Sequence, residues 1–478
     1  MNRLKNIAIA LLSVTALGCG DDFLDISPVS SLGELEVVQT MDDLENALNG
    51  AYTYLKYWRG DQPYVGDLLA EDFMCTQNAS GHLGYAYEYN NTKNSCPTGV
   101  WNRTYTGSFH INSILEKADH IKEKNSRYNE IISELKFIRA ILHFEGVRAY
   151  GPLPGNLGKG GIQADALGVM ICDKVPENIR QTFYRDKVSD VYRFIITDME
   201  QNVDALSKNK KNGYLNYYGG KAFMARVYLY HEDWGKALAC AKEVIEKGPY
   251  QLYERKDYVN AWKNEFTSES ILEIKSSETD NSSWNSIGYY ADTAGYAAVA
   301  ATKDFEAVMA QDPSDIRFSL LTYSHNKGYY APMGKYPGRD GNTKICNPKV
   351  IRLSEMYLIA AECAMRLNDP TAGKYLSDLR EKRSLQNPRK YDSGITIEDV
   401  LYERRVELFC EGQRCWDLWR NQKTVVRWEN IEEKEAKGHW DRIGVIPYND
   451  YRTIWPLAIS QVDLWEGEDQ IKQQNPGY

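Results

Sequence analysis

After its first eighteen residues, the sequence contains no apolar run that approaches the roughly 20 residues needed to cross a membrane. It also lacks an excess of positive charge, because 66 Asp and Glu stand against 57 Lys and Arg, a net charge of -9. Nucleic acid is a polyanion and is therefore not expected as a partner. The chain is long, at 478 residues, and 43% of it is hydrophobic, which is enough for a large folded core.

Motifs typical of enzymes and metal sites are missing as well. The seven histidines are scattered, no two cysteines have zinc spacing, and there is no Gly-x-Ser-x-Gly elbow. Residues 155–161 resemble a phosphate-binding loop, but no Ser or Thr follows Lys159, so we interpret them as a turn after a helix. We predict no enzyme activity, no metal and no cofactor. A glycoside hydrolase stays as a remote alternative, although we interpret Asp21-Asp22 and Glu71-Asp72 as solvated charges.

Cysteine is scarce, with nine residues in the whole chain. Several of them, such as Cys240 and Cys363, lie inside apolar helical patterns, so we expect mostly buried free thiols. If the protein is exported and any pair is oxidised, Cys75 and Cys96 are the pair we expect to bridge.

The N-terminus has the pattern of a bacterial lipoprotein signal. Basic residues at positions 3 and 5 precede an apolar run over residues 7–17, and small residues lead to Cys19. We predict a signal peptide over residues 1–18 and acylation of Cys19, which would anchor the mature chain without a spanning helix. A plain secretory signal is the alternative.

Helical periodicity dominates the rest of the chain. Apolar residues fall on one stripe from Phe137 to Phe144 and stop at Gly151-Pro152, and a second helix is predicted over about residues 187–206. A short strand is predicted at residues 271–275. The expected fold is mostly α, with a few short strands.

Residues 218–250 carry the spacing of a tetratricopeptide repeat. Ala225, Tyr228, Ala237 and Pro249 stand at the required separations, and Asp233-Trp234 falls at the turn between the two helices. Residues 351–380 repeat the pattern more loosely. We predict tetratricopeptide-type helical repeats that support a loop-rich half, with a generic helical hairpin as the alternative.

Aromatic residues are abundant, with 34 Tyr and 11 Trp. Tyr52 and Trp101 lie inside helical patterns and are expected in the core. Others lie in segments rich in Gly, Asn and Ser, where flat apolar faces with hydrogen-bonding edges suit a sugar ring or a peptide. The candidate ligand-binding residues are Trp58, Tyr85, Tyr87, Tyr89, Trp284, Tyr289, Tyr290 and Tyr296.

The densest charge pattern covers residues 402–420. Glu403, Glu407 and Glu411 are spaced by one helical turn, and Arg404 and Arg405 are expected within reach of them. Gly412 should break the helix. We interpret the segment as structural rather than catalytic, because ion pairs of this kind fix the orientation of helices.

Several short motifs together identify a family. The chain resembles the SusD/RagB family of nutrient-binding outer-membrane lipoproteins of Bacteroidota. The residues that carry the resemblance are, in order, Phe23-Leu-Asp-Ile-Ser-Pro28, Leu135-Lys-x-Ile-Arg-Ala140, Tyr150-Gly-Pro152, Glu403-Arg-Arg-x-Glu-Leu408, Glu411-Gly-x-Arg414, Trp416-Asp-Leu418, Trp455-Pro456 and Gln474-Asn-Pro-Gly-Tyr478.

The resemblance implies one SusD-like domain over residues 19–478. Its helical-repeat scaffold would cover about residues 100–250 and 350–422, and its ligand-facing loops about residues 58–99, 252–345 and 422–460. It also implies a lipid-anchored protein on the extracellular face of the outer membrane, which delivers ligands to a SusC-like TonB-dependent transporter.

The ligand that the resemblance implies is an oligosaccharide, with an oligopeptide, as in the RagB branch, as the alternative. The family's ligand-contacting aromatics lie in variable loops, so the resemblance assigns none of them to this chain. A scaffold without any ligand is a further alternative.

Overall fold

A computed structural model describes residues 38–76, 82–178, 181–427 and 444–478. The predicted signal peptide, Cys19 and Asp21-Asp22 lie outside the described residues. Among the residues that are described, no helix is both long and apolar enough to cross a membrane.

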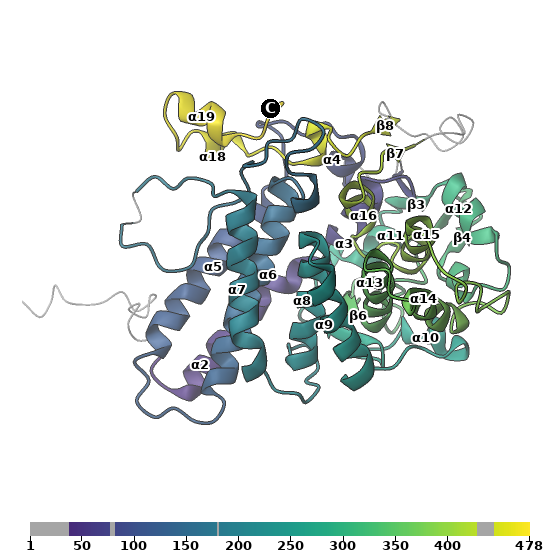
Figure 1. Ribbon diagram of the computed structural model, residues 1–478, viewed down its shortest axis with the longest axis horizontal. Coiled ribbons are helices and arrows are strands. Elements are labelled where there is room, and N and C mark those ends of the chain that lie inside the picture. Colours follow the sequence, from purple (N-terminus) through teal and green to yellow (C-terminus); the bar gives the residue numbers. More distant parts are fainter. Residues whose placement is uncertain (1–37, 77–81, 179–180, 428–443) are drawn as a thin grey trace, which may run out of the picture.

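Helices form most of the regular structure (Figure 1). The helices are α2 (Met41–Tyr52), α3 (Gln62–Leu68), α4 (Gly84–Tyr87), α5 (Gly99–Ala118), α6 (Tyr128–Tyr150), α7 (Val188–Asn202), α8 (Tyr217–His231), α9 (Trp234–Lys247), α10 (Tyr258–Ala261), α11 (Ile287–Ala291), α12 (Lys303–Ala310), α13 (Leu353–Arg366), α14 (Ala372–Glu381), α15 (Ile397–Glu407), α16 (Arg414–Arg420), α18 (Ile459–Val462) and α19 (Glu468–Gln473).

The long helices stand side by side as hairpins. Figure 1 shows α6, α7, α8 and α9 in one row, and α9 packs in turn on α13. Helix α6 ends at Tyr150, directly before the Gly151-Pro152 stop signal, and α7 lies within the predicted second helix. The mostly α fold with tetratricopeptide-like hairpins is therefore confirmed.

The predicted repeat at residues 218–250 is the hairpin α8–α9. The side chain of Asp233 caps α9 by accepting a hydrogen bond from the amide of Lys236 at 3.2 Å. Ala225 and Ala237 are fully buried, so small residues lie where the two helices cross. A second hairpin, α13–α14, turns at Asn368, whose φ of 55° lies in the left-handed region.

The strands are short, and within the described part of the chain they occur in four antiparallel pairs. Strand β1 (Phe73–Cys75) pairs with β3 (Val299–Ala301), and β2 (Ser270–Glu273), the predicted strand, pairs with β6 (Lys349–Arg352). The other pairs are β4 (Thr322–Ser324) with β5 (Tyr329–Ala331) and β7 (Val425–Val426) with β8 (Val445–Ile446). These pairs connect the loop-rich segments to one another and to the helices.

The core confirms some expectations and corrects one. Tyr52 and Trp101 are buried, as predicted. The eight cysteines among the described residues are free thiols, and six of them are buried. The expected bridge between Cys75 and Cys96 is wrong: the Cys75 thiol contacts the carbonyl of His82 at 3.3 Å instead, and burial raises its pKa to about 12.

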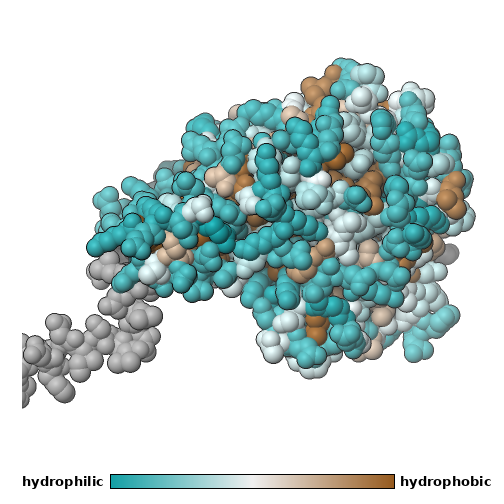
Figure 2. Space-filling view, turned by 90° about the horizontal axis from the view of Figure 1, so that it is seen from below, coloured by the Kyte–Doolittle hydropathy of each residue, from teal (hydrophilic) through white to brown (hydrophobic). Residues whose placement is uncertain are grey.

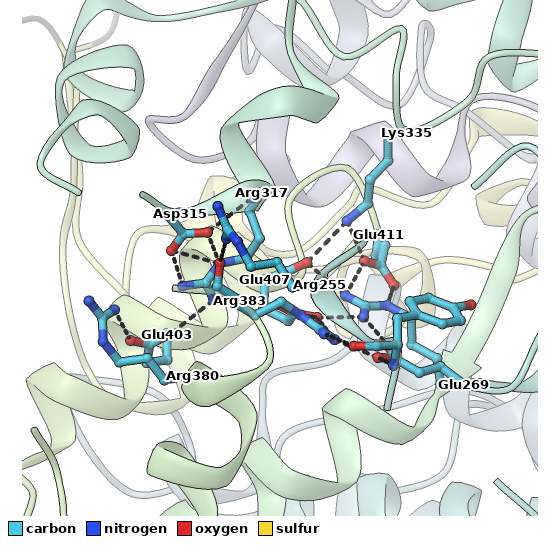
Figure 3. Close-up of polar contacts among 12 residues, drawn as sticks. Arg255, Glu269, Asp315, Arg317, Lys335, Arg380, Arg383, Glu403, Glu407 and Glu411 are labelled. Carbon is cyan, nitrogen blue, oxygen red and sulfur yellow. Dashed lines mark hydrogen bonds and ion pairs between the residues drawn. The ribbon is translucent and has the colours of Figure 1, made fainter. Parts of the chain in front are cut away.

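Residues 402–420 are structural, but their partners differ from those predicted. Helix α15 ends at Glu407 and α16 begins at Arg414, so the break around Gly412 is confirmed. Glu403 and Glu407 pair with arginines from distant segments, and not with Arg404 or Arg405 (Figure 3).

The same network corrects the interpretation of Glu71-Asp72. Asp72 is fully buried, and Arg405 Nε donates to its carboxylate at 2.6 Å. Arg414 Nε donates to Glu71 at 3.1 Å. Both carboxylates are therefore ion-pair partners, Asp72 buried and Glu71 partly buried, and not solvated charges.

The surface is mostly hydrophilic on the face seen from below (Figure 2). Hydrophobic residues there form small patches that are separated by polar side chains.

Candidate functional site

The candidate site is a chain of rings that we call the aromatic platform: Trp284, Tyr289, Tyr290, Tyr296 and His82. Four of these residues come from one loop that contains the short helix α11. The ring of Trp284 is the most open, with 54% of the residue exposed. Large aromatic side chains are seldom left this exposed, which makes the platform the first place to look for ligand binding.

The rings of the platform contact one another, some edge to face and some tilted. The centroids of Trp284 and Tyr289 lie 5.0 Å apart at 77°, and those of Tyr289 and Tyr296 lie 5.0 Å apart at 80°. The ring of His82 lies 4.4 Å from that of Tyr296. These are favourable aromatic distances, so the rings hold one another in place.

Local contacts fix the loop that carries the platform. The hydroxyl of Ser286 accepts from the amide of Tyr289 at 3.4 Å and donates to the carbonyl of Thr343 at 3.0 Å. Gly288 lies against the same carbonyl, and a Cβ at that position would come within 2.2 Å of it. Only glycine allows this close approach, which brings residues 343–344 beside the rings.

A second contact joins the loop to the sheet. The amide of Tyr296 donates to the carbonyl of Tyr289 at 3.1 Å, and the amide of Ala298 donates to that of Tyr290 at 2.9 Å. Ala298 directly precedes β3, so the platform lies next to a paired strand. The ring positions are therefore set before any ligand arrives, which lowers the entropy cost of binding.

Polar groups surround the rings. The ammonium of Lys344 lies 3.2 Å from the ring centroid of Trp284 and 5.5 Å from that of Tyr289. The Asp292 carboxylate accepts from the Thr343 hydroxyl at 3.0 Å. Asn285 accepts from the hydroxyl of Tyr290 at 3.3 Å. The site thus combines apolar faces with directional hydrogen-bonding groups.

The members of the platform differ in how deeply they are buried. Tyr289 and Tyr296 are half-buried, whereas Tyr290 is only 5% exposed. Burial also raises the pKa of the Tyr290 hydroxyl. Tyr290 therefore supports the platform from beneath, and Trp284, Tyr289 and Tyr296 offer the accessible surface.

The other residues predicted to bind ligand do not form exposed rings at this platform. Trp58 is buried and stacks on Tyr57 at 4.4 Å. Tyr87 and Tyr89 are buried, and the Arg427 guanidinium lies 4.7 and 5.0 Å from their ring centroids. Trp58, Tyr87 and Tyr89 therefore lie in the core.

Tyr85 is intermediate. It is half-buried, and its hydroxyl donates to Asp61 at 2.9 Å while its ring meets that of Trp455. Sequence reasoning missed His82 and Lys344, which are far from Trp284 in the chain. A lone histidine and a loop lysine carry no pattern that would have found them.

A separate cavity of about 610 Å³ lies between residues 152–167 and the C-terminal segment 449–476. None of the predicted ligand-binding residues lines it. Within the described part of the chain, no group of three or more His, Cys, Asp or Glu could hold a metal ion. The platform is therefore the site that the predicted residues support.

Comparisons with known proteins identify the fold and the family. One family model, described as the SusD family, matches residues 250–478. A second, described as starch-binding associating with outer membrane, matches residues 22–229. Together the two models account for most of the chain.

Similar proteins agree with this assignment. The SusD-like protein P2 of Formosa agariphila is 24% identical, over 88% of this chain and 91% of its own length. The crystal structure of a putative sugar binding protein from Bacteroides vulgatus is 29% identical with a TM-score of 0.82, and the match covers 92% of this chain and 99% of that one.

A laminarin-binding SusD-like protein shares the fold, at 19% identity and a TM-score of 0.69, over 92% of this chain and all of its own. The helical fold, the two adjoining family models and these relatives lead to one conclusion: the chain belongs to the SusD/RagB family.

Proposed function

We propose that this protein binds extracellular oligosaccharides at the aromatic platform and does no chemistry on them. The observation that carries the proposal is the open ring of Trp284, held edge to face against Tyr289. A sugar ring presents an apolar face bordered by hydroxyl groups, and the platform offers the complementary surface with Asn285 and Asp292 at its border.

Affinity at such a platform is modest. An open surface buries only part of its ligand, so a few stacking contacts and hydrogen bonds have to offset the loss of translational freedom. Modest affinity suits a protein that must release what it binds. The sugar-related names of several relatives support a carbohydrate rather than a peptide ligand.

The place of the protein in the cell is part of the proposal. We infer a mature domain of residues 19–478 that is lipidated at Cys19 and held at the extracellular face of the outer membrane. The description of the family that matches residues 22–229 supports association with the outer membrane. Delivery to a SusC-like TonB-dependent transporter is the function that family membership favours.

Isothermal titration tests the binding proposal. The purified protein is titrated with plant, mucin and bacterial glycans and, separately, with a casein digest. We expect at least one glycan to bind, and Trp284→Ala to weaken it about tenfold or more while the melting temperature shifts by no more than about 2 °C. Binding of the digest alone would favour the oligopeptide alternative.

Tyr184→Ala is the matched control. Tyr184 is exposed to a similar degree, at 49%, but lies next to the C-terminal segment, where its hydroxyl donates to Asp469 at 3.0 Å. Its removal should leave glycan binding unchanged. Equal losses in the two variants would contradict a site at Trp284, and release of shorter sugars during the titration would contradict a protein without catalysis.

A further inference from the structure

Lys344 is a lysine that lies over the platform. Lys374 and Lys423, by comparison, each pair with a carboxylate, Asp378 and Glu398 respectively. Among the described residues Lys344 forms no such pair, and its ammonium lies over the face of Trp284 instead. A cation therefore lies on the most open ring of the platform without a carboxylate to neutralise it.

Backbone contacts fix the turn that carries Lys344. The Lys344 amide donates to the Asn342 side chain at 3.1 Å, and the next residue, Ile345, is buried. The preceding residue, Thr343, is joined to the platform loop through Ser286 and Asp292. The lysine thus comes from a turn that packs directly on the loop it covers.

The carboxylates near the platform are already engaged. Asp292 accepts from Thr343 and from the amide of Ala294 at 2.9 Å. Asp280 pairs with Lys56 and Arg59. None of these interactions would have to break for an outside anion to reach the Lys344 ammonium.

We infer that the ligand of the aromatic platform is an acidic oligosaccharide, whose carboxylate or sulfate ester pairs with the Lys344 ammonium. This inference rests on the proposed function. A neutral sugar that stacks on the covered face of Trp284 displaces the ammonium and offers it only neutral hydroxyl acceptors. An acidic sugar gives the displaced ammonium a charge-assisted hydrogen bond, which is the stronger kind.

The expected preference for acidic over neutral oligosaccharides follows from the charge-assisted hydrogen bond to Lys344. A hydrogen bond between charged groups corresponds to about a tenfold to hundredfold change in affinity. Acidic oligomers should therefore bind more tightly than neutral ones of the same length by about that factor. Because the pair is near the surface, the advantage should shrink as salt is added.

The test uses the folded mature protein and three hexasaccharides. Hexagalacturonate carries carboxylates, a κ-carrageenan hexamer carries sulfate esters, and laminarihexaose is neutral. Titration calorimetry at low salt should show at least one acidic probe binding tenfold or more tightly than the neutral one, and the stronger acidic probe identifies the anion.

Variants of Lys344 then test the residue itself. Lys344→Met keeps the aliphatic length and should lose the tenfold or greater advantage of the acidic probe, while Lys344→Arg should retain it. Lys374→Met, far along the chain on α14 (Ala372–Glu381), is the control and should change nothing.

The outcomes separate the two proposals. If Lys344→Met leaves acidic binding intact, or if the neutral probe binds as tightly as the acidic ones, the inference about Lys344 is overturned while a platform that depends on Trp284 survives. If none of the three probes binds and the broader glycan panel also fails, the proposed function falls, and this inference with it.

Discussion

Replacing Glu407 by glutamine should destabilise the protein by several kcal/mol. Its side chain is fully buried, and its carboxylate accepts from Arg352 Nη1 at 2.6 Å, from Arg383 Nη2 at 3.1 Å and from Arg317 Nη1 at 3.4 Å (Figure 3). One carboxylate is thus shared by three guanidinium groups in the interior of the molecule. The amide of glutamine has the same shape but removes the negative charge that these groups face.

The magnitude follows from the cost of an unbalanced buried charge. Removing one partner of a buried ion pair costs about 3–5 kcal/mol, because the remaining charge stays desolvated. Glu269 and Glu403 still neutralise part of the cluster, through Arg383 and Arg317. We therefore expect about 3 kcal/mol for Glu407→Gln, at the lower end of that range.

Urea unfolding at pH 7 measures this loss. Glu398→Gln is the matched control on the same helix, since Glu398 is exposed and pairs with Lys423 at the surface. The control should cost less than about 1 kcal/mol. A cost below about 1 kcal/mol for Glu407→Gln as well would contradict a carboxylate that neutralises three buried guanidinium groups.

The same carboxylate contributes to stability in acid. Burial alone would raise the pKa of Glu407, but the guanidinium groups of Arg383, Arg352 and Arg317 outweigh burial and hold that pKa well below its ordinary value. The stabilisation is present above about pH 4.5, the ordinary pKa of a glutamate, and is lost as the pH falls toward the lowered pKa. The stability of Glu407→Gln should therefore fall less steeply than that of the wild type as the pH is lowered below about 4.5.

Three further predictions concern pH and membrane attachment. Burial raises the pKa of Glu134 to about 7, so wild-type stability should fall by about 3 kcal/mol as the pH rises from 4.5 to 7, and urea unfolding of Glu134→Gln should lack that fall. Burial lowers the pKa of His143 to about 4, and its Nε2 accepts from the amide of Cys172 at 3.1 Å, so its ring protons in NMR spectra should not titrate between pH 7 and 5; a midpoint near 6.5 would contradict this. Cys19→Ala should move the protein from the membrane to the soluble fraction on cell fractionation and leave glycan binding intact, whereas membrane retention would contradict the lipoprotein prediction.

The helical scaffold could be predicted because its signals are local. Gly151 directly follows the last residue of α6, and Asp233 is the N-cap of α9, so each signal lies next to the helix end that it predicts. Small residues at 225 and 237 indicate a close helix crossing at the spacing that a hairpin requires. Such signals need only a few neighbouring residues to be read.

The partners in the buried network could not be predicted in the same way. Glu407 faces Arg317, Arg352 and Arg383, which come from three different segments. The arginines next to Glu407 in sequence pair elsewhere, Arg404 with Asp417 and Arg405 with Asp72. Helical spacing shows which charges can meet along one helix, but not which distant segment packs against it.

The candidate site could be predicted only in part from the sequence, because tertiary packing decides which aromatic residues are exposed. Tyr87 and Trp284 look alike in composition and loop context, yet one is buried against Arg427 and the other is exposed. Burial is decided by tertiary packing. His82, a member of the platform, and Lys344, which lies over it, are about 200 and 60 residues away from Trp284 in the sequence. No local pattern could therefore link them to Trp284.

A crystal structure with the tightest-binding glycan of the panel would show directly whether the aromatic platform is the binding site. We expect a sugar ring within about 4 Å of the rings of Trp284 or Tyr289, with the Lys344 ammonium in contact with an acidic group of the ligand. A glycan bound in the cavity between residues 152–167 and 449–476, with no sugar at the platform, would mean that the platform is not the site.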